Sequence, residues 1–163
     1  LFDNTMHTQL QYELAEFDLK NGNITAMTER IRKYWVVMLT SGSDCLHECT
    51  ITTEPIPRID EHHTDKPSFV SYCHAWTAAA TVLLPMGIAG IKPLKPGFEE
   101  VEIKPQTDIF DGFKCVVPTP SGEIAVKYSR NCFEYFIPNA ITARLVINDG
   151  AIDVSGGGRI VIK

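Results

Sequence analysis

The apolar residues of this 163-residue chain change their spacing near Gly90, and that change limits the possible folds more than any other feature. Before Gly90 they recur at steps of three and four residues, which is the period of an amphipathic helix. After it they alternate along short runs separated by turn-forming residues roughly every ten positions, which is typical of an antiparallel β-sandwich. The sequence therefore predicts an α + β fold, with a helical segment over residues 1–89 and a β-sandwich domain over residues 90–163.

Three helices are expected in the first part. One ends at the stop signal Asn21-Gly22, and its apolar face is formed by Met6, Leu10, Leu14 and Phe17. The second, over Thr25–Thr40, has the strongest helical period. The third, over Ser71–Leu84, is apolar nearly all round, so it needs further helices around it to be buried. Between the last two, residues 43–67 contain three prolines and many polar residues, and we expect an irregular loop there.

Short β-prone runs follow Gly90. The expected strands are Val101–Lys104, Phe113–Val117, Glu123–Tyr128, Cys132–Ile137, Ala143–Ile147 and Arg159–Ile162. The chain has 15 basic and 20 acidic residues, a net charge of −5, and no basic block, so a nucleic-acid partner is not expected. Its longest apolar stretch, Ala75–Ile91, contains Pro85 and two glycines and is too short for a membrane span. The sequence starts with Leu1 directly ahead of a helix, and we expect it to be part of a larger protein.

Residues able to carry chemistry lie after the second helix and at the start of the third. Glu48 follows His47 in the first group, and His74 and Trp76 form the second. A carboxylate transfers protons, an imidazole binds hydroxyl groups, and an indole packs against the apolar face of a pyranose. These residue types are those that a sugar site needs, although a Glu in a polar loop is commonly solvated and a His before an apolar helix is commonly a core residue.

The same region allows zinc binding as an alternative. Its possible ligands are Cys45, His47, Cys49, His62, His63, Cys73 and His74. The Cys-x-His-x-Cys spacing matches no standard zinc knuckle, and His62-His63 is most simply part of an exposed polar loop. The odd number of cysteines, five in all, argues against a disulfide framework and favours buried thiols.

Five segments match one set of motifs, in the same order, along nearly the whole chain. Tyr34–Leu39 with Gly42–Glu48 is similar to YWGGML…GATTFWE, and Ser71–Ala79 is similar to S-x-C-H-[AG]-W-S-A. Gly90–Pro105 resembles G-[IV]-[KR]-P-x-x-P-G-[FW]…P, Val117–Ile124 resembles V-P-T-P-x-G-x-I, and Ile137–Ala143 resembles I-P-x-x-T-x-A. These are motifs of the bacterial α-L-rhamnosidases.

The resemblance implies an architecture and a reaction. Members of that family have an (α/α)6 toroid that carries the active site, followed by a small antiparallel β-sandwich, so this chain would supply the terminal helices of the toroid and the sandwich. They hydrolyse terminal α-L-rhamnosides with inversion: one carboxylic acid protonates the leaving oxygen and a second carboxylate activates water. Glu48 matches the second carboxylate, His74 the sugar-contacting His, and Trp76 lines the same opening. His47 replaces the family's Trp in the pocket wall, where its imidazole would alter the proton affinity of Glu48.

Other departures concern the pocket and the general acid. Asp44 and Cys45 replace paired threonines, and Val36-Val37 replaces two glycines. The general acid is expected upstream of this chain, because the early carboxylates are most simply residues on polar helix faces: Asp3, Glu13, Glu16 and Asp18. Without its acid, the 163-residue chain alone is expected to be inactive.

The resulting expectation is the C-terminal portion of an α-L-rhamnosidase-like glycosidase, with no cofactor and with a rhamnose-containing oligosaccharide or glycoside as its partner. A non-catalytic carbohydrate-binding or interaction module from a truncated or decayed hydrolase is the alternative, and a zinc protein is a third. As a stand-alone product, the chain would expose apolar helix faces and self-associate. A bacterial protein of this type can be cytoplasmic, periplasmic or secreted.

Overall fold

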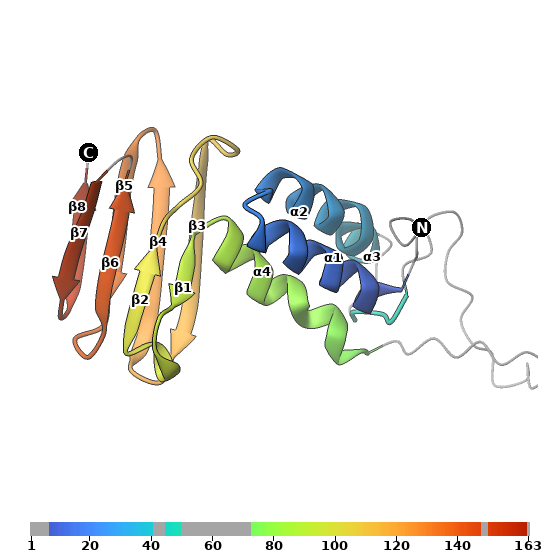
Figure 1. The fold of residues 1–163 in the computed structure, drawn as a ribbon, viewed down its shortest axis with the longest axis horizontal. Helices are drawn as coiled ribbons and strands as arrows, with labels where there is room; N and C mark the ends of the chain where they lie inside the picture. The colour runs from blue at the N-terminus through green and yellow to red at the C-terminus, as the bar shows by residue number, and fades with distance from the viewer. Residues whose placement is uncertain (1–6, 41–44, 50–72, 148–149, 163) are drawn as a thin grey trace, which may run out of the picture. The chain divides into compact units, whose positions relative to one another are not determined.

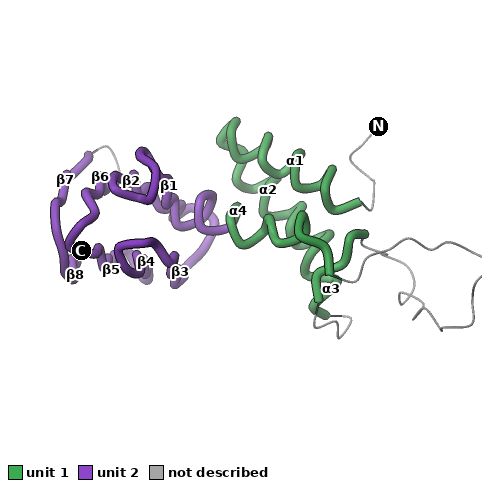
Figure 2. Tube along the Cα trace, turned by 90° about the horizontal axis from the view of Figure 1, so that it is seen from below, with its two compact units in different colours: residues 1–83 green, residues 84–163 purple. Residues whose placement is uncertain are grey.

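The computed structural model describes residues 7–40, 45–49, 73–147 and 150–162. Two compact units are present, Leu1–Leu83 and Leu84–Lys163, shown in green and purple in Figure 2. The first is helical and the second consists mainly of strands (Figure 1), so the predicted α + β class is confirmed. Within these described ranges, no helix is long and apolar enough to cross a membrane.

Helices α1 (Thr8–Lys20) and α2 (Ile24–Ile31) follow the predicted start and stop signals. Gly22 takes a positive φ of 74° between them, and the Asn23 side chain accepts a hydrogen bond of 3.2 Å from the Ala26 N–H, as an N-cap does. Arg30 joins the two helices, because its Nε donates to Asp18 Oδ2 at 3.2 Å and its Nη1 donates to Gln11 Oε1 at 2.8 Å. Asp18 is therefore part of a largely buried ion pair and not a solvated polar-face residue as predicted.

The buried positions of α1 differ from the apolar face that the sequence indicated. The side chains turned inward are Thr8, Gln11, Ala15 and Leu19. Leu10 and Leu14 are half-buried, Phe17 is 64% exposed, and Met6 lies outside the described residues. Within this chain the helix thus buries a mixed polar and apolar face and leaves Phe17 in solvent.

The predicted helix over Thr25–Thr40 is continuous but irregular. After α2 the chain forms a π-helical turn, η1 (Arg32–Val36), and then the short α3 (Val37–Thr40). Tyr34 and Trp35 are both buried in the π turn. The predicted periodicity holds up to Met38, but Leu39 is exposed.

The third helix begins later than predicted. Cys73 and His74 are not helical; a 3₁₀ turn, η2 (Ala75–Ala79), leads into α4 (Ala80–Gly87). His74 is the extended N-cap residue of η2, and its N–H donates to the Leu46 carbonyl at 2.9 Å. Ser71, Tyr72 and most of the loop predicted over residues 43–67 lie outside the described residues.

The β unit is a sandwich of two four-stranded sheets. Its strands are β1 (Ile91–Pro93), β2 (Glu100–Ile103), β3 (Gly112–Thr119), β4 (Gly122–Ser129), β5 (Cys132–Ile137), β6 (Thr142–Ile147), β7 (Gly150–Ser155) and β8 (Gly158–Ile162). The sheet orders are β1-β2-β6-β7 and β3-β4-β5-β8. All neighbours are antiparallel except β2 and β6, which run parallel, so the all-antiparallel prediction was wrong for this pair. Alternation shows which face is buried but carries no information on strand direction.

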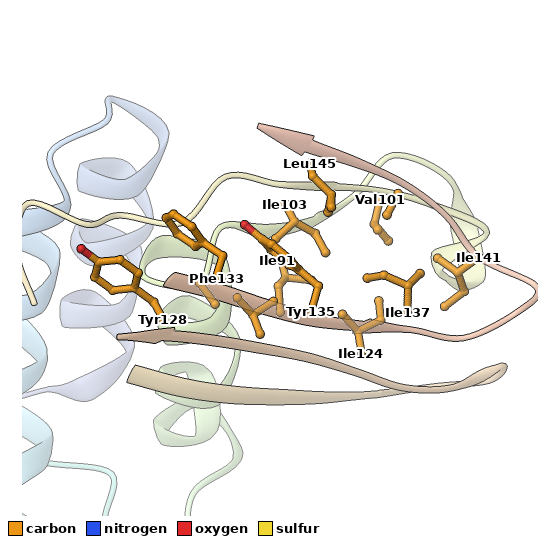
Figure 3. Packing of buried hydrophobic residues seen from close by; sticks show 13 residues of the cluster. Ile91, Val101, Ile103, Ile124, Tyr128, Phe133, Tyr135, Ile137, Ile141 and Leu145 are labelled. Carbon is orange, nitrogen blue, oxygen red and sulfur yellow. The ribbon is translucent and has the colours of Figure 1, made fainter. Parts of the chain in front are cut away.

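The sandwich core is apolar and continuous (Figure 3). Alternate residues of each sheet point between the two layers, and the fully buried ones include Ile103, Ile124, Tyr135, Ile137 and Leu145. Gly90 precedes the first strand with a φ of +67°, and a Cβ there would lie 1.9 Å from the Lys104 carbonyl oxygen. A side chain does not fit at this position because of that clash and the positive φ, and the backbones are held close by the hydrogen bond of 3.1 Å from the Lys104 N–H to the Gly90 carbonyl.

Candidate functional site

The segment Leu46–Cys49 carries Glu48 and lies between the starts of two helices. On one side, the Thr8 N–H donates to the Glu48 carbonyl at 3.0 Å, and His7 pairs with Cys49 in an isolated antiparallel bridge. On the other, the His74 N–H donates to the Leu46 carbonyl. The starts of α1 and η2 and the segment Leu46–Cys49, which are far apart in sequence, therefore meet around the predicted site residues.

The Glu48 carboxylate is at the edge of this junction. Its side chain is 22% exposed, and its Oε1 lies 3.4 Å from His7 Nε2. Burial and, after it, the negative charge of Glu48 raise the pKa of the neighbouring Cys49 thiol. The carboxylate is thus neither in bulk water nor sealed in the core, and its partner imidazole is His7.

His74 and Trp76 form an aromatic pair at the start of η2. Their ring centroids are 4.9 Å apart with the planes inclined by 57°. Trp76 is 48% exposed and His74 is half-buried, so about half of the indole surface is open to solvent beside a partly exposed imidazole. An exposed indole face is a suitable surface for the apolar side of a sugar ring.

His47 differs from the other predicted site residues. It is only 5% exposed, and its carbonyl accepts a 2.6 Å hydrogen bond from Thr77 Oγ1. This depth places the imidazole beneath the surface, where it can support the wall of a site. Its predicted contact with a sugar stays a prediction.

Four residues of this junction were not foreseen: His7, Thr8, Trp35 and Thr77. Thr8 and Thr77 are fully buried, and Trp35 Nε1 donates to the Thr77 carbonyl at 2.6 Å. Thr77 stands where the quoted motif has a Ser after its Trp, so a hydroxyl at that place was the available signal. His7 and Thr8 lie between Met6 and Leu10 of the predicted apolar face, and no sequence pattern marked them.

The zinc alternative gains no support from the part of the chain that the structure describes. There, no three His, Cys, Asp or Glu side chains are grouped as metal ligands. The five cysteines, all within the described ranges, form no disulfide. His62 and His63 lie outside the described residues.

The early carboxylates were expected to lack a catalytic arrangement. Glu16 forms an ion pair of 3.0 Å with Lys20, and Glu13 accepts a hydrogen bond of 3.5 Å from Gln9, both on the exposed part of α1. Asp18 is held by Arg30. Asp3 lies outside the described residues.

The comparisons with known proteins agree on one family. The model of the bacterial alpha-L-rhamnosidase C-terminal domain matches residues 90–159, which include most of the β-sandwich. No curated protein matches the sequence. The native α-L-rhamnosidase of Aspergillus terreus is similar in structure, with a TM-score of 0.75 and 17% identity over 94% of this chain and 19% of that one.

Two further solved structures are similar. The Streptomyces avermitilis α-L-rhamnosidase in complex with L-rhamnose gives a TM-score of 0.69 and 17% identity, covering 94% of this chain and 17% of that one. The Dictyoglumus thermophilum α-L-rhamnosidase gives a TM-score of 0.65 and 13% identity, covering 93% of this chain and 20% of that one. The chain therefore spans about a fifth of the length of these proteins. Together these matches confirm the resemblance: residues 90–159 match the C-terminal domain of the bacterial α-L-rhamnosidases, and the fold of the chain is similar to part of three solved α-L-rhamnosidases.

Proposed function

We propose that this chain is the C-terminal portion of an inverting α-L-rhamnosidase, in which Glu48 is the general base. The observation that carries the proposal is the position of the Glu48 carboxylate, at the end of a segment that hydrogen bonds fix to the starts of α1 and η2. A base that activates water must be held firmly and must also reach solvent, and a side chain that is 22% exposed meets both conditions.

The reaction needs two carboxyl groups on opposite sides of the sugar. In an inverting glycosidase they stand about 6.5–9.5 Å apart, which leaves room for the attacking water. Glu48 would take a proton from that water as it attacks the anomeric carbon, while the acid protonates the departing oxygen. We propose that the acid comes from residues outside this chain, since Glu13, Glu16 and Asp18 have partners on or beside α1.

Substrate binding would use the aromatic pair. Trp76 would pack on the apolar face of a rhamnose ring and His74 would hydrogen-bond to a hydroxyl, with His47 supporting the wall beneath. The substrate would be a terminal α-L-rhamnoside in an oligosaccharide or other glycoside. The presence of L-rhamnose in one similar structure supports this choice of sugar.

The helical unit would be the end of an (α/α)6 toroid. Phe17, Leu39 and Val82 are large apolar residues that this chain leaves exposed on its helices. Further toroid helices would cover them in a longer protein. In a stand-alone chain the same residues would drive self-association.

The test is hydrolysis of an aryl α-L-rhamnoside by the full-length protein that carries this chain. Glu48→Gln keeps the size of the side chain and removes the base, so kcat should fall by about 10³-fold or more, while the circular dichroism spectrum stays the same. Glu13→Gln is the matched control, because Glu13 is exposed on α1, and it should leave kcat unchanged. A Glu48→Gln enzyme with wild-type turnover would remove Glu48 from the mechanism.

One alternative is a carbohydrate-binding module without catalysis, which the departures at Asp44, Cys45 and His47 favour. In that case the full-length protein would bind rhamnose without releasing it from any glycoside. Trp76→Ala would abolish that binding, and Glu48→Gln would not. Turnover that depends on Glu48 excludes this alternative.

A further inference from the structure

Two buried hydroxyl groups connect the three segments that meet at Glu48. Thr8 begins α1 and Thr77 lies within η2, and their Oγ1 atoms are 2.8 Å apart. Thr77 Oγ1 is also 2.6 Å from the His47 carbonyl oxygen, and Thr8 Oγ1 is 2.6 Å from the Glu48 carbonyl oxygen. The pair therefore contacts two successive carbonyl groups, the second of which belongs to the proposed base.

The number of hydrogens restricts how these contacts are made. Each hydroxyl has one hydrogen to donate. The two hydroxyls can therefore form hydrogen bonds in only two of the three short contacts, which are those of Thr8 with Glu48, Thr8 with Thr77 and Thr77 with His47. The Glu48 carbonyl already accepts the Thr8 N–H at 3.0 Å. Both hydrogens are used on the carbonyl groups: Thr8 Oγ1 donates to the Glu48 carbonyl and Thr77 Oγ1 donates to the His47 carbonyl, each at 2.6 Å, and the two hydroxyl oxygens lie in contact at 2.8 Å.

Thr77 is held on its backbone as well. Its carbonyl accepts the Trp35 indole N–H at 2.6 Å, and its N–H donates to the His74 carbonyl at 3.1 Å. Trp35 is buried within the π turn η1, and π turns place side chains at positions that a regular α-helix does not offer. Thr77 is thus held by Trp35 of η1 on its backbone and bonds to the Glu48 segment through its side chain.

We propose that Thr8 and Thr77 are positioning residues for Glu48, acting through the backbone of residues 47 and 48; this inference rests on the proposed function. Neither hydroxyl touches the carboxylate, so neither takes part in proton transfer. Their effect is geometric: a displacement of about 1 Å in a catalytic group can cost about 10²-fold in rate. Because both hydroxyls are fully buried, removing one takes a hydrogen-bond donor away from a carbonyl of the Glu48 segment and favours rearrangement of that segment.

The experiment compares Thr77→Val and Thr77→Ser in the full-length protein with an aryl α-L-rhamnoside. Valine keeps the shape of threonine and loses the hydroxyl, whereas serine keeps the hydroxyl. Thr77→Val should lower kcat by about 10- to 100-fold with KM within about twofold of wild type. Thr77→Ser should recover most of that loss, and Thr8→Val should repeat the effect of Thr77→Val. Thr81→Val is the control, because the exposed Thr81 hydroxyl bonds only within its own helix, to the Ala78 carbonyl at 2.6 Å.

Two outcomes would overturn the inference: a folded Thr77→Val enzyme with wild-type kcat, or a Thr77→Ser enzyme as slow as Thr77→Val. A second readout keeps the test independent of turnover. In Thr77→Val, hydrogen exchange should become faster at the Thr8 and His74 amides, which bind the Glu48 and Leu46 carbonyls, and should be unchanged at the Lys104 amide of the β unit. Unchanged exchange at Thr8 and His74 would reject the positioning role. Failure of Glu48→Gln to affect turnover, with faster exchange in Thr77→Val, would instead reject only the proposed base.

Discussion

The two units of this molecule both bury apolar residues, but they differ in how many polar residues they bury. The β-sandwich encloses an apolar core with residues from both of its own sheets, and its buried residues there are almost all aliphatic or aromatic. The helical unit buries Thr8, Gln11, Thr28, His47 and Thr77, while Phe17, Leu39 and Val82 stay exposed. The sandwich core is therefore almost wholly apolar, whereas the helical unit combines apolar packing with buried polar contacts, several of which hold the segment that carries Glu48.

The largest expected effect concerns the sandwich core. Leu145 on β6 is fully buried, and its partner in register on β7, Ile152, is 52% exposed. Leu145→Ala should lower the free energy of unfolding of the β unit by about 3 kcal/mol, because it loses buried surface and leaves a cavity. Urea unfolding followed by the amide signals of each unit measures this, and the signals of the helical unit should keep their midpoint.

Ile152→Ala is the matched control, with an expected loss under about 1 kcal/mol. Equal losses for the two substitutions would mean that the apolar core is not what stabilises the sandwich. A parallel shift in the midpoint of the helical unit would show that the two units do not unfold separately, and the contrast between them would fail.

A smaller effect on stability is expected at Tyr135, which places a hydroxyl group in the otherwise apolar core of the sandwich. Tyr135 is fully buried on β5, and its hydroxyl has no hydrogen-bond partner within the described part of the chain. Tyr135→Phe should therefore raise the stability of the β unit by about 1 kcal/mol, since a desolvated hydroxyl without a partner is unfavourable. Tyr128→Phe should lower it by a similar amount, because the Tyr128 hydroxyl donates to Asn131 Oδ1 at 3.1 Å.

Tyr135→Phe should also change how the stability of the β unit depends on alkaline pH. Burial raises the pKa of the Tyr135 phenol above its ordinary value, so above about pH 10 the unfolded chain loses this proton and the folded chain keeps it. The unfolded state then binds fewer protons, and stability falls as pH rises. Urea midpoints measured at pH 8 and pH 10.5 should differ less in Tyr135→Phe than in the wild type; an equal difference would contradict the assignment.

The sequence predicted most of the fold because most of it depends on periodicity. The two helices up to Met38 and six of the eight strands were found from apolar spacing and turn residues. Strand β1 was missed because it has three residues and ends in Pro93, and β7 because its edge position leaves most of its side chains exposed. The parallel pairing of β2 with β6 depends on contacts between distant segments, which spacing does not record.

The site was predictable only where residues stand in recognisable motifs. Glu48, His74 and Trp76 were predicted in this way, and their roles stay predictions. His7 and Thr8 were not, because their importance arises from contacts about 40 residues away in sequence. The extended conformation of His74 was missed for the same reason: its backbone N–H bonds to Leu46, a contact between distant segments that local periodicity does not record.

The smallest expected effect compares two cysteines, one in each unit. Burial raises the pKa of both Cys49 and Cys115, but only for Cys49 does the charge of Glu48 contribute. The thiolate is the form that reacts with iodoacetamide, so Glu48→Gln should make Cys49 react roughly threefold faster at pH 8, because the neighbouring negative charge is gone. Cys115 should react at its wild-type rate, which makes it the internal control; peptide mass spectrometry follows both sites in one sample. If Cys49 reacts at an unchanged rate, no ionised carboxylate stands beside it, and Glu48 cannot be the base that the helical unit is proposed to hold.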